Sequence, residues 1–193
     1  MNNSKGLEPA EFEKFRVFLK EACGISLAEN KQYLVTTRIR KILLDNNISC
    51  LIDLVEQMKN ARHSGLRQQV IDAMTTNETF WFRDTYPYEY LKATLLPEVQ
   101  EQKAMGGIKI WSAACSSGQE PYSLSMTIEE YRRINMGVLP RQVDIVATDL
   151  SSSILDQAKS GEYDKMQVLR GLSKERLDAF FDKLPDEMWR IKP

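Results

Sequence analysis

The sequence predicts an α/β protein in which an N-terminal all-α helical bundle is followed by a Rossmann-like, doubly wound sheet. Apolar residues recur at helical spacing through residues 1–75. In residues 76–193 two short apolar runs follow, with an amphipathic helix between them. A strand, a helix and a strand in this order form a βαβ unit, whose strands lie parallel in one sheet. We therefore expect two domains, residues 1–75 and residues 76–193.

Four helices are expected in the first domain. The first runs from about Pro9 to Cys23 and stops at Gly24, because aromatic and aliphatic residues recur there at helical spacing. Asn46 and its neighbours should end the second helix, and Ser49 should be the N-cap of the third. The apolar faces of the last three helices are Val35, Ile39, Ile42 and Leu43; Leu51, Leu54, Val55 and Met58; and Leu66, Val70, Ile71 and Met74. The short connections between these helices predict a small bundle.

Two strands are expected in the second domain, Ile108–Ala114 and Val143–Thr148. The helix between them has Pro121 in its first turn and ends near Gly137. Its inward face consists of Leu124, Ile128 and Tyr131.

Another helix should follow the second strand. Ser151 or Ser152 is its expected N-cap, and Gly161 is its expected stop. Its inward residues are Ile154, Leu155 and Ala158. This helix begins the second half of a doubly wound sheet.

Composition excludes several classes of protein. The chain has 193 residues, of which 42% are hydrophobic and 27% charged, and its net charge is -1, as in ordinary soluble proteins. No apolar run approaches the roughly 20 residues of a membrane span, and Met1–Gly6 lacks the apolar core of a secretory signal. Neither domain carries a large net charge. We expect a cytoplasmic protein that neither inserts into membranes nor binds nucleic acid.

Cysteine and histidine usage narrows the chemistry further. Cys23, Cys50 and Cys115 are widely spaced and odd in number, so they predict neither a disulfide framework nor a zinc site. His63 is the only histidine, which excludes His-based triads and His-rich metal sites. We expect no metal, and a reaction that does not require imidazole.

The candidate site lies at the carboxyl ends of the two strands, where open α/β sheets bind ligands. The loop Cys115–Glu120 contains one glycine, whereas a dinucleotide fingerprint needs three, so an NAD-type ligand is disfavoured. Asp149 is placed either to bind a ribose diol or to cap the following helix. Glu120 lies in a first helical turn, where the helix dipole favours a carboxylate with or without a ligand.

Two further stretches are unusual. Thr76–Asp84 combines polar and charged residues with three consecutive aromatics, of which one or two should be core because neighbouring side chains point in different directions. Lys31, Arg38 and Lys41 should lie on one side of the second helix, beside its apolar face. These three cations form either a solvated face or a docking site for an acidic partner helix.

Three motifs together resemble the CheR family, the chemoreceptor glutamate O-methyltransferases of bacterial chemotaxis. They are Thr76–Asp84, Ile110–Ser123 and Ala147–Ser151, and they occur in the family's order. The resemblance covers essentially the whole chain. It implies a class I S-adenosylmethionine-dependent methyltransferase domain, with S-adenosylmethionine as cofactor and S-adenosylhomocysteine as product.

The resemblance also implies roles for individual residues. Asn77, Thr79 and Arg83 would line the methionyl and reacting end of the cofactor, Glu120 would contact the cofactor, and Asp149 would hold its ribose. Arg83 would also position the incoming carboxylate, which makes it the candidate catalytic residue. A glutamate with a pKa of about 4.3 is ionised at pH 7 and needs no general base, in keeping with the scarcity of histidine.

The family's helical domain is thought to recognise the cytoplasmic helices of the receptors. By resemblance, Lys31, Arg38 and Lys41 are therefore candidate substrate-recognition residues. Family members that dock on a receptor-tail pentapeptide tend to have a longer, glycine-containing loop where this chain has Asp182–Glu187. We expect no such tether for this protein.

The chain departs from the family at its end. Family members continue well beyond this point, and Met188–Pro193 resembles the first strand of their small β-subdomain. Only two core strands are then expected, with open edges that should be unstable or adhesive. We expect the methyltransferase domain to be incomplete in this chain, which should be a fragment or pair with another copy and be a poor methyltransferase alone.

Two alternatives to a methyltransferase follow from the same sequence. A noncatalytic adaptor of the same family would bind S-adenosylmethionine or S-adenosylhomocysteine without transferring a methyl group. A nucleotide-binding oxidoreductase is the other alternative, and the single-glycine loop argues against it.

Overall fold

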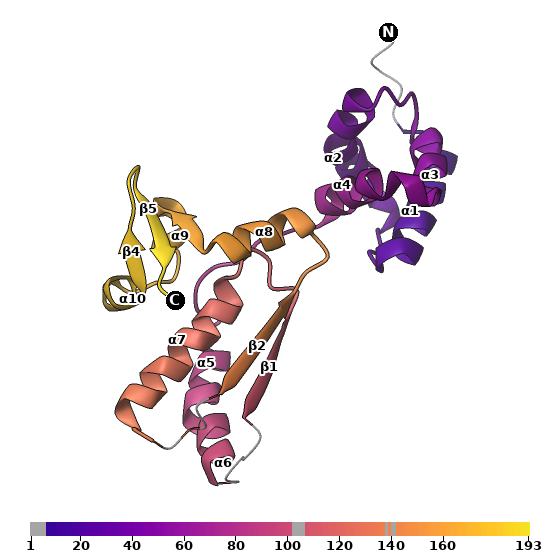
Figure 1. Ribbon diagram of the computed structural model, residues 1–193. Helices are drawn as coiled ribbons and strands as arrows, with labels where there is room; N and C mark the ends of the chain where they lie inside the picture. Colours follow the sequence, from indigo (N-terminus) through magenta and orange to yellow (C-terminus); the bar gives the residue numbers. More distant parts are fainter. Residues whose placement is uncertain (1–6, 102–106, 138, 140–141) are drawn as a thin grey trace. The chain divides into compact units, whose positions relative to one another are not determined.

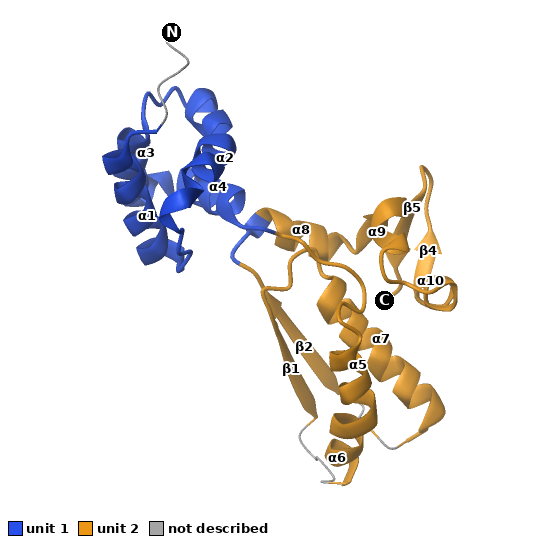
Figure 2. Ribbon diagram, turned by 180° about the vertical axis from the view of Figure 1, so that it is seen from behind, with its two compact units in different colours: residues 1–76, 150–152 blue, residues 77–149, 153–193 orange. Residues whose placement is uncertain are grey.

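A computed structural model describes residues 7–101, 107–137, 139 and 142–193. The expectation for Met1–Gly6 lies outside these residues. The chain divides into two compact units, one formed by residues 1–76 and 150–152, the other by residues 77–149 and 153–193 (Figure 2). In the part of the chain that the structure describes, every helix is too short or too polar to cross a membrane.

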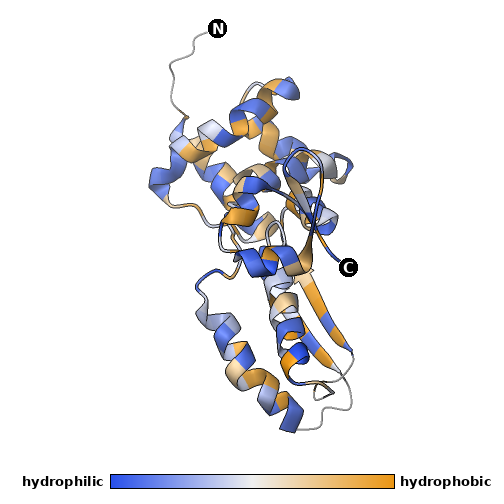
Figure 3. Cartoon of the chain, turned by 90° about the vertical axis from the view of Figure 1, so that its left-hand side faces the viewer, coloured by the Kyte–Doolittle hydropathy of each residue, from blue (hydrophilic) through white to orange (hydrophobic). Residues whose placement is uncertain are grey.

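The first unit consists of short helices around one apolar core. In chain order they are α1 (Pro9–Cys23), the 3₁₀ turn η1 (Glu29–Lys31), α2 (Gln32–Asp45), α3 (Leu51–Lys59), the 3₁₀ turn η2 (Ala61–His63) and α4 (Ser64–Met74). Each α-helix of this unit carries both hydrophilic and hydrophobic residues, and helices with both colours are visible in Figure 3. The hydrophobic residues meet in the core. The predicted bounds of α1 are confirmed, because Gly24 adopts the left-handed conformation (φ 78°) that ends the helix.

The predicted N-cap of the third helix is wrong by one residue. Cys50, not Ser49, occupies that position, and its carbonyl accepts a hydrogen bond from the Leu54 N–H (3.2 Å). Leu51 and Leu54 are both buried. Burial of these leucines fixes where the helix begins, and the polar residue is left one position outside it.

Three residues from far along the chain complete the first unit. The Leu150 carbonyl accepts a hydrogen bond from the Gln68 amide (2.8 Å), and the Ser152 N–H donates one to Asp72 (3.1 Å). Ser151, which lies between these two residues in the sequence, is fully buried. Helix α4 therefore fixes the segment that immediately follows Asp149.

The second unit contains the predicted parallel strand pair. Strands β1 (Ile108–Ala113) and β2 (Val143–Thr148) pair in register from Ile108–Val143 to Ala113–Thr148, and helix α7 (Gln119–Ile134) connects them (Figure 1). Apolar side chains of α7 pack on one face of this sheet. On β1 the neighbouring Trp111 is 71% exposed, as the alternation of a strand requires.

Three helical segments that the sequence did not predict lie between α4 and β1. They are α5 (Tyr86–Tyr90), the π-helical turn η3 (Leu91–Leu95) and α6 (Leu96–Glu101). Pro97 lies two residues beyond the π turn and lacks the N–H that a regular α-helix would use. The wider turn accommodates this proline while Leu91 and Leu96 stay buried.

The rest of the second unit is a small antiparallel sheet with its own helices. Its elements are α8 (Ser152–Ser160), β3 (Glu162–Asp164), α9 (Lys165–Leu169), α10 (Lys174–Phe180), β4 (Phe181–Lys183) and β5 (Met188–Ile191), and the strand order is β3-β5-β4. Met188–Pro193 was expected to hold the first strand of a β-subdomain, and this is wrong. Strand β5 is the central strand and the last along the chain, pairing with two strands of three residues each.

Candidate functional site

A sharply bent loop follows the carboxyl end of β1 and leads into α7. The Cys115 N–H donates to the Thr148 carbonyl (2.9 Å), which extends the strand pairing by one step. Ala114 (φ 60°), Ser116 (φ 51°) and Gly118 (φ 94°) then adopt left-handed conformations before α7 begins. This sequence of turns keeps the loop at the sheet edge, where the predicted site residues lie.

Ser116 connects two of the predicted site residues. Its backbone N–H donates to Oδ2 of Asp149 (2.8 Å), and its hydroxyl donates to the carbonyl of Asn77 (2.8 Å). The structure thus brings Asn77 and Asp149, which are far apart in sequence, to opposite sides of one buried serine. Ser116 lies inside the motif Ile110–Ser123, but no role was predicted for it. Both of its contacts are with residues far away in the sequence.

Glu120 is held by a buried serine of the neighbouring strand. The Ser112 hydroxyl donates to Oε1 of Glu120 (2.7 Å), and Ser112 is almost completely buried while Glu120 is exposed. The hydrogen bond orients the carboxylate of Glu120 above the end of β1. Glu120 is therefore both a first-turn acid of α7 and a fixed polar group at the sheet edge.

The charges of Asp149 and Glu120 both act on Cys115, and the charge of Glu120 also acts on Tyr88. Burial, and next the charge of Asp149, raises the pKa of the Cys115 thiol, to which Glu120 contributes less. Burial, and next the charge of Glu120, raises the pKa of Tyr88 to about 12. Both groups therefore stay protonated near neutral pH, and neither provides an activated nucleophile.

A tyrosine of the small sheet supports the loop from below. The Tyr163 hydroxyl donates to the Ser117 carbonyl (2.7 Å). A Cβ atom on Gly118 would lie 3.0 Å from both the Tyr163 hydroxyl and the Tyr122 ring. Gly118 is needed for its positive φ and for this close approach, rather than as part of a phosphate-binding fingerprint.

The remaining predicted residues lie on the segment after Asn77. Thr79 is half-buried, and Arg83 is exposed. The Arg83 guanidinium donates to the Glu78 carbonyl (3.3 Å) and lies over the Phe80 ring, 5.7 Å from its centroid. Arg83 and Thr79 share this segment, whereas Glu120 accepts a hydrogen bond from Ser112 and Asp149 accepts one from Ser116.

One or two of the three consecutive aromatics were predicted to be core residues, and two of them are buried. Trp81 is fully buried and packs edge-to-face on Tyr163 and Phe181, with ring centroids 4.8 and 5.3 Å away. Phe82 is also buried, and Phe80 is half-buried under two guanidinium groups.

The three predicted recognition cations have different surroundings. Lys31 is half-buried at the start of α2, near the Tyr33 ring, and Lys41 is exposed. Arg38 instead donates hydrogen bonds to the carbonyls at the C-terminal end of α4 and to the Thr76 hydroxyl. The Arg38 guanidinium therefore stabilises the end of α4, in addition to any contact it makes with a receptor.

Arg38→Ala is expected to lower the free energy of unfolding by about 2 kcal/mol, because several helix-end carbonyls lose a charged donor at once. Urea denaturation measures this change. The matched control is Lys41→Ala on the same helix, which should stay within about 0.5 kcal/mol of the parent protein. Equal stability of the two variants would contradict the assigned contact.

The donor set fits S-adenosylmethionine better than a dinucleotide. Two carboxylates, Asp149 and Glu120, converge at the strand ends, and the loop offers a single glycine whose Cβ position is filled by protein atoms. Carboxylates suit a ribose diol and a cationic sulfonium, whereas they would repel a pyrophosphate. Asp149, Glu120, Asn77, Thr79 and Arg83 are the residues that would hold this cofactor.

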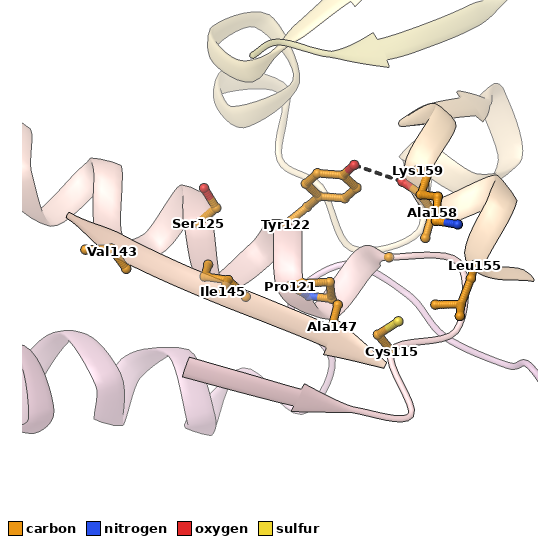
Figure 4. Close-up of a pocket in the computed structure, with 11 residues that line it drawn as sticks. Cys115, Pro121, Tyr122, Ser125, Val143, Ile145, Ala147, Leu155, Ala158 and Lys159 are labelled. Atoms are coloured by element: carbon orange, nitrogen blue, oxygen red, sulfur yellow. Dashed lines mark hydrogen bonds between the residues drawn. The ribbon is translucent and has the colours of Figure 1, made fainter. Parts of the chain in front are cut away.

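A separate apolar cavity of about 430 Å³ lies beside the site, between β2, α7 and α8 (Figure 4). Val143, Ile145 and Leu155 line it, and Cys115 and Gly118 of the loop border it. None of the five predicted cofactor residues lines this cavity. The candidate site is therefore the loop edge, not this cavity.

Comparisons with known proteins agree with this architecture. Residues 10–75 match a family model described as the all-alpha domain of CheR methyltransferase, and residues 77–193 match its SAM-binding domain. The chain is 56% identical over 186 residues to "Chemotaxis protein methyltransferase 1" of Pseudomonas aeruginosa and 52% identical over 183 residues to "Chemotaxis protein methyltransferase Cher2" of Pseudomonas putida. Each comparison covers 95% of this chain, but 67% and 66% of the relative. The chain thus spans about two thirds of the length of these relatives.

Proposed function

The chain belongs to the CheR methyltransferase family, and from this premise we propose that it methylates glutamate side chains of chemoreceptors, forming glutamyl methyl esters. S-adenosylmethionine is the methyl donor of this domain. The observation that carries the proposal is the Ser116 bridge, which joins Asn77 of the arginine-bearing segment to Asp149 at the end of β2. This contact connects a cofactor-binding acid with the segment that would receive the acceptor.

The proposed reaction places few demands on the protein. When bound, S-adenosylmethionine supplies an electrophilic methyl group on a sulfonium. Arg83 binds and orients the acceptor carboxylate, which is already ionised at pH 7 because its pKa is about 4.3. Catalysis then depends on positioning two oppositely charged reactants and excluding water from between them. The protonated Cys115 and Tyr88 do not compete as nucleophiles.

The acceptor we propose is the cytoplasmic helical region of chemoreceptors. Lys31, Arg38 and Lys41 on the first unit are the proposed contacts with its acidic residues, with Lys41 the most accessible of the three. The β4–β5 connection spans only four residues, and the Leu184 N–H closes it on the Met188 carbonyl (2.8 Å). Such a tight turn supports the proposal that no receptor-tail pentapeptide docks there.

Methyl transfer tests the proposal directly. The protein expressed from its complete reading frame is incubated with S-adenosylmethionine labelled on the methyl group and with a helical cytoplasmic receptor fragment. We expect label on glutamate as a base-labile ester that releases methanol, because methyl esters hydrolyse in base. A fragment whose acceptor glutamates are changed to alanine is the control and should stay unlabelled. Tight S-adenosylhomocysteine binding without any label transfer would favour the adaptor function instead.

A further inference from the structure

The turn after α9 packs directly on the segment that carries Arg83. The Trp81 N–H donates to the Arg170 carbonyl (3.2 Å), and the Trp81 indole N–H donates to the Gln167 carbonyl (3.1 Å). A Cβ atom on Gly171 would lie 2.1 Å from the Trp81 carbonyl oxygen, so the two backbones touch. The position of residues 78–83 is therefore set by this turn.

The segment needs such support because its backbone is strained. Phe82 (φ 52°), Asp84 (φ 62°) and Thr85 (φ 52°) all adopt left-handed conformations although none is glycine. Each such residue costs about 1–2 kcal/mol. Contacts from outside the segment must hold this conformation, and Phe82 receives one when its N–H donates to the Ser123 hydroxyl (3.1 Å).

Two arginines share the same two partners on this segment. The Arg170 guanidinium donates to the carboxylate of Glu78 (2.6 Å) and lies 4.7 Å from the centroid of the Phe80 ring. Arg83 approaches the same ring and donates to the backbone carbonyl of Glu78, not to its carboxylate. The hydrogen bond from Arg170, and next its charge, lowers the pKa of Glu78, while Arg83 has the smallest effect.

We propose that Arg170 is a positioning residue that occupies the carboxylate of Glu78 and so leaves the Arg83 guanidinium available to the acceptor carboxylate. Arg83 also lies 4.0 Å from the exposed carboxylate of Asp84, which is a long contact and leaves most of its donors open. Without Arg170, the carboxylate of Glu78 would be a second anion on this segment with no arginine of its own. An arginine paired with an internal carboxylate binds an external one less well, because the two anions compete for the same donors. Arg170 acts through Glu78 and does not itself contact the acceptor. The inference rests on the proposed role of Arg83.

The test is a rescue experiment with the protein expressed from its complete reading frame. Arg170→Ala should lower kcat/KM for methyl transfer about 10-fold, mainly by raising KM for the acceptor, because one charged hydrogen-bond partner is redirected. The double variant Arg170→Ala with Glu78→Gln should recover to within about 2-fold of the parent, because the competing anion is gone. Glu78→Gln alone should stay near the parent. Arg190→Ala is the matched control, since it removes an exposed arginine paired with Glu162 in the small sheet.

Failure to rescue overturns the proposal. If the double variant is as slow as Arg170→Ala, or if Arg170→Ala leaves kcat/KM unchanged, Arg170 does not act through Glu78. Arg170→Lys keeps the charge and should retain most of the activity. If Arg170→Ala does not fold, Arg170→Gln, which also removes the charge, replaces it in both the single and the double variant. S-adenosylhomocysteine affinity should stay within about 2-fold in every variant, because no proposed cofactor contact is altered.

A second readout does not depend on methyl transfer. The side-chain Nε–Hε NMR signal of Arg83, identified by its loss in Arg83→Lys, should shift in Arg170→Ala and return in the double variant. It should not move in Arg190→Ala. These NMR shifts without any methyl transfer would refute the proposed function and leave the positioning role standing. An unmoved signal together with normal transfer would refute the positioning role alone.

Discussion

Asp149→Ala is expected to weaken S-adenosylhomocysteine binding on the order of 100-fold, a loss of about 3 kcal/mol. Asp149 is half-buried at the end of β2, where its carboxylate is proposed to accept hydrogen bonds from the ribose diol. Removing it takes away a charged acceptor and also frees the Ser116 N–H that it binds. Calorimetric titration of the purified protein measures the affinity.

Two further variants separate ribose binding from a general effect of Asp149 on the loop. Asp144→Ala removes an acid from the opposite end of the same strand and should bind normally, because Asp144 accepts a hydrogen bond from the Gln142 amide, away from the candidate site. Asp149→Asn keeps a side-chain oxygen for Ser116 but loses the charge, and should bind with intermediate affinity. Normal binding by Asp149→Ala would show that Asp149 only caps α8.

Arg83→Ala is expected to lower kcat/KM for methyl transfer on the order of 100-fold, about 3 kcal/mol of transition-state stabilisation. Arg83 is the exposed cation of the segment after Asn77, and the acceptor is a carboxylate. Losing its guanidinium removes both charge and orientation from the attacking oxygen. Initial rates at varied receptor-fragment concentration measure the change.

Arg83→Lys distinguishes orientation from charge. Lysine restores the positive charge without the planar pair of donors, so its rate should lie between those of Arg83→Ala and the parent. A circular dichroism melting curve close to that of the parent checks that the variant is folded. A parent-like rate in Arg83→Ala would exclude Arg83 from the reaction.

Elements defined by their own apolar period were predictable from the sequence. The bounds of α1 and β2 follow from local spacing and from residues such as Gly24 that stop an element. The placement of Asp149 beside the loop after β1 was also predictable, because the carboxyl ends of parallel strands meet at one edge. These predictions needed no information about distant contacts.

What the sequence could not predict depends on contacts between distant residues. Strands β3 and β4 have three residues each, too few to show a period of two, and they exist because β5 pairs with both. Ser116 and Arg38 gained their roles from partners more than 30 residues away. The π turn before Pro97 accommodates the missing N–H of this proline while Leu91 and Leu96 stay buried.

The distribution of tryptophans gives this protein built-in optical probes. Trp81 is fully buried against Tyr163 and lies two residues before Arg83, whereas Trp111 is 71% exposed and its indole N–H donates to the Thr148 hydroxyl (3.0 Å), one residue before Asp149. The third tryptophan, Trp189, is half-buried and is replaced in a Trp189→Phe background. A buried indole emits at shorter wavelength than a hydrated one, so the two remaining indoles contribute to different parts of the emission spectrum. Quenching by iodide selects the exposed indole. Occupation of the proposed ribose site should therefore change the red, iodide-sensitive emission, while loosening of the segment that carries Arg83 should change the blue emission.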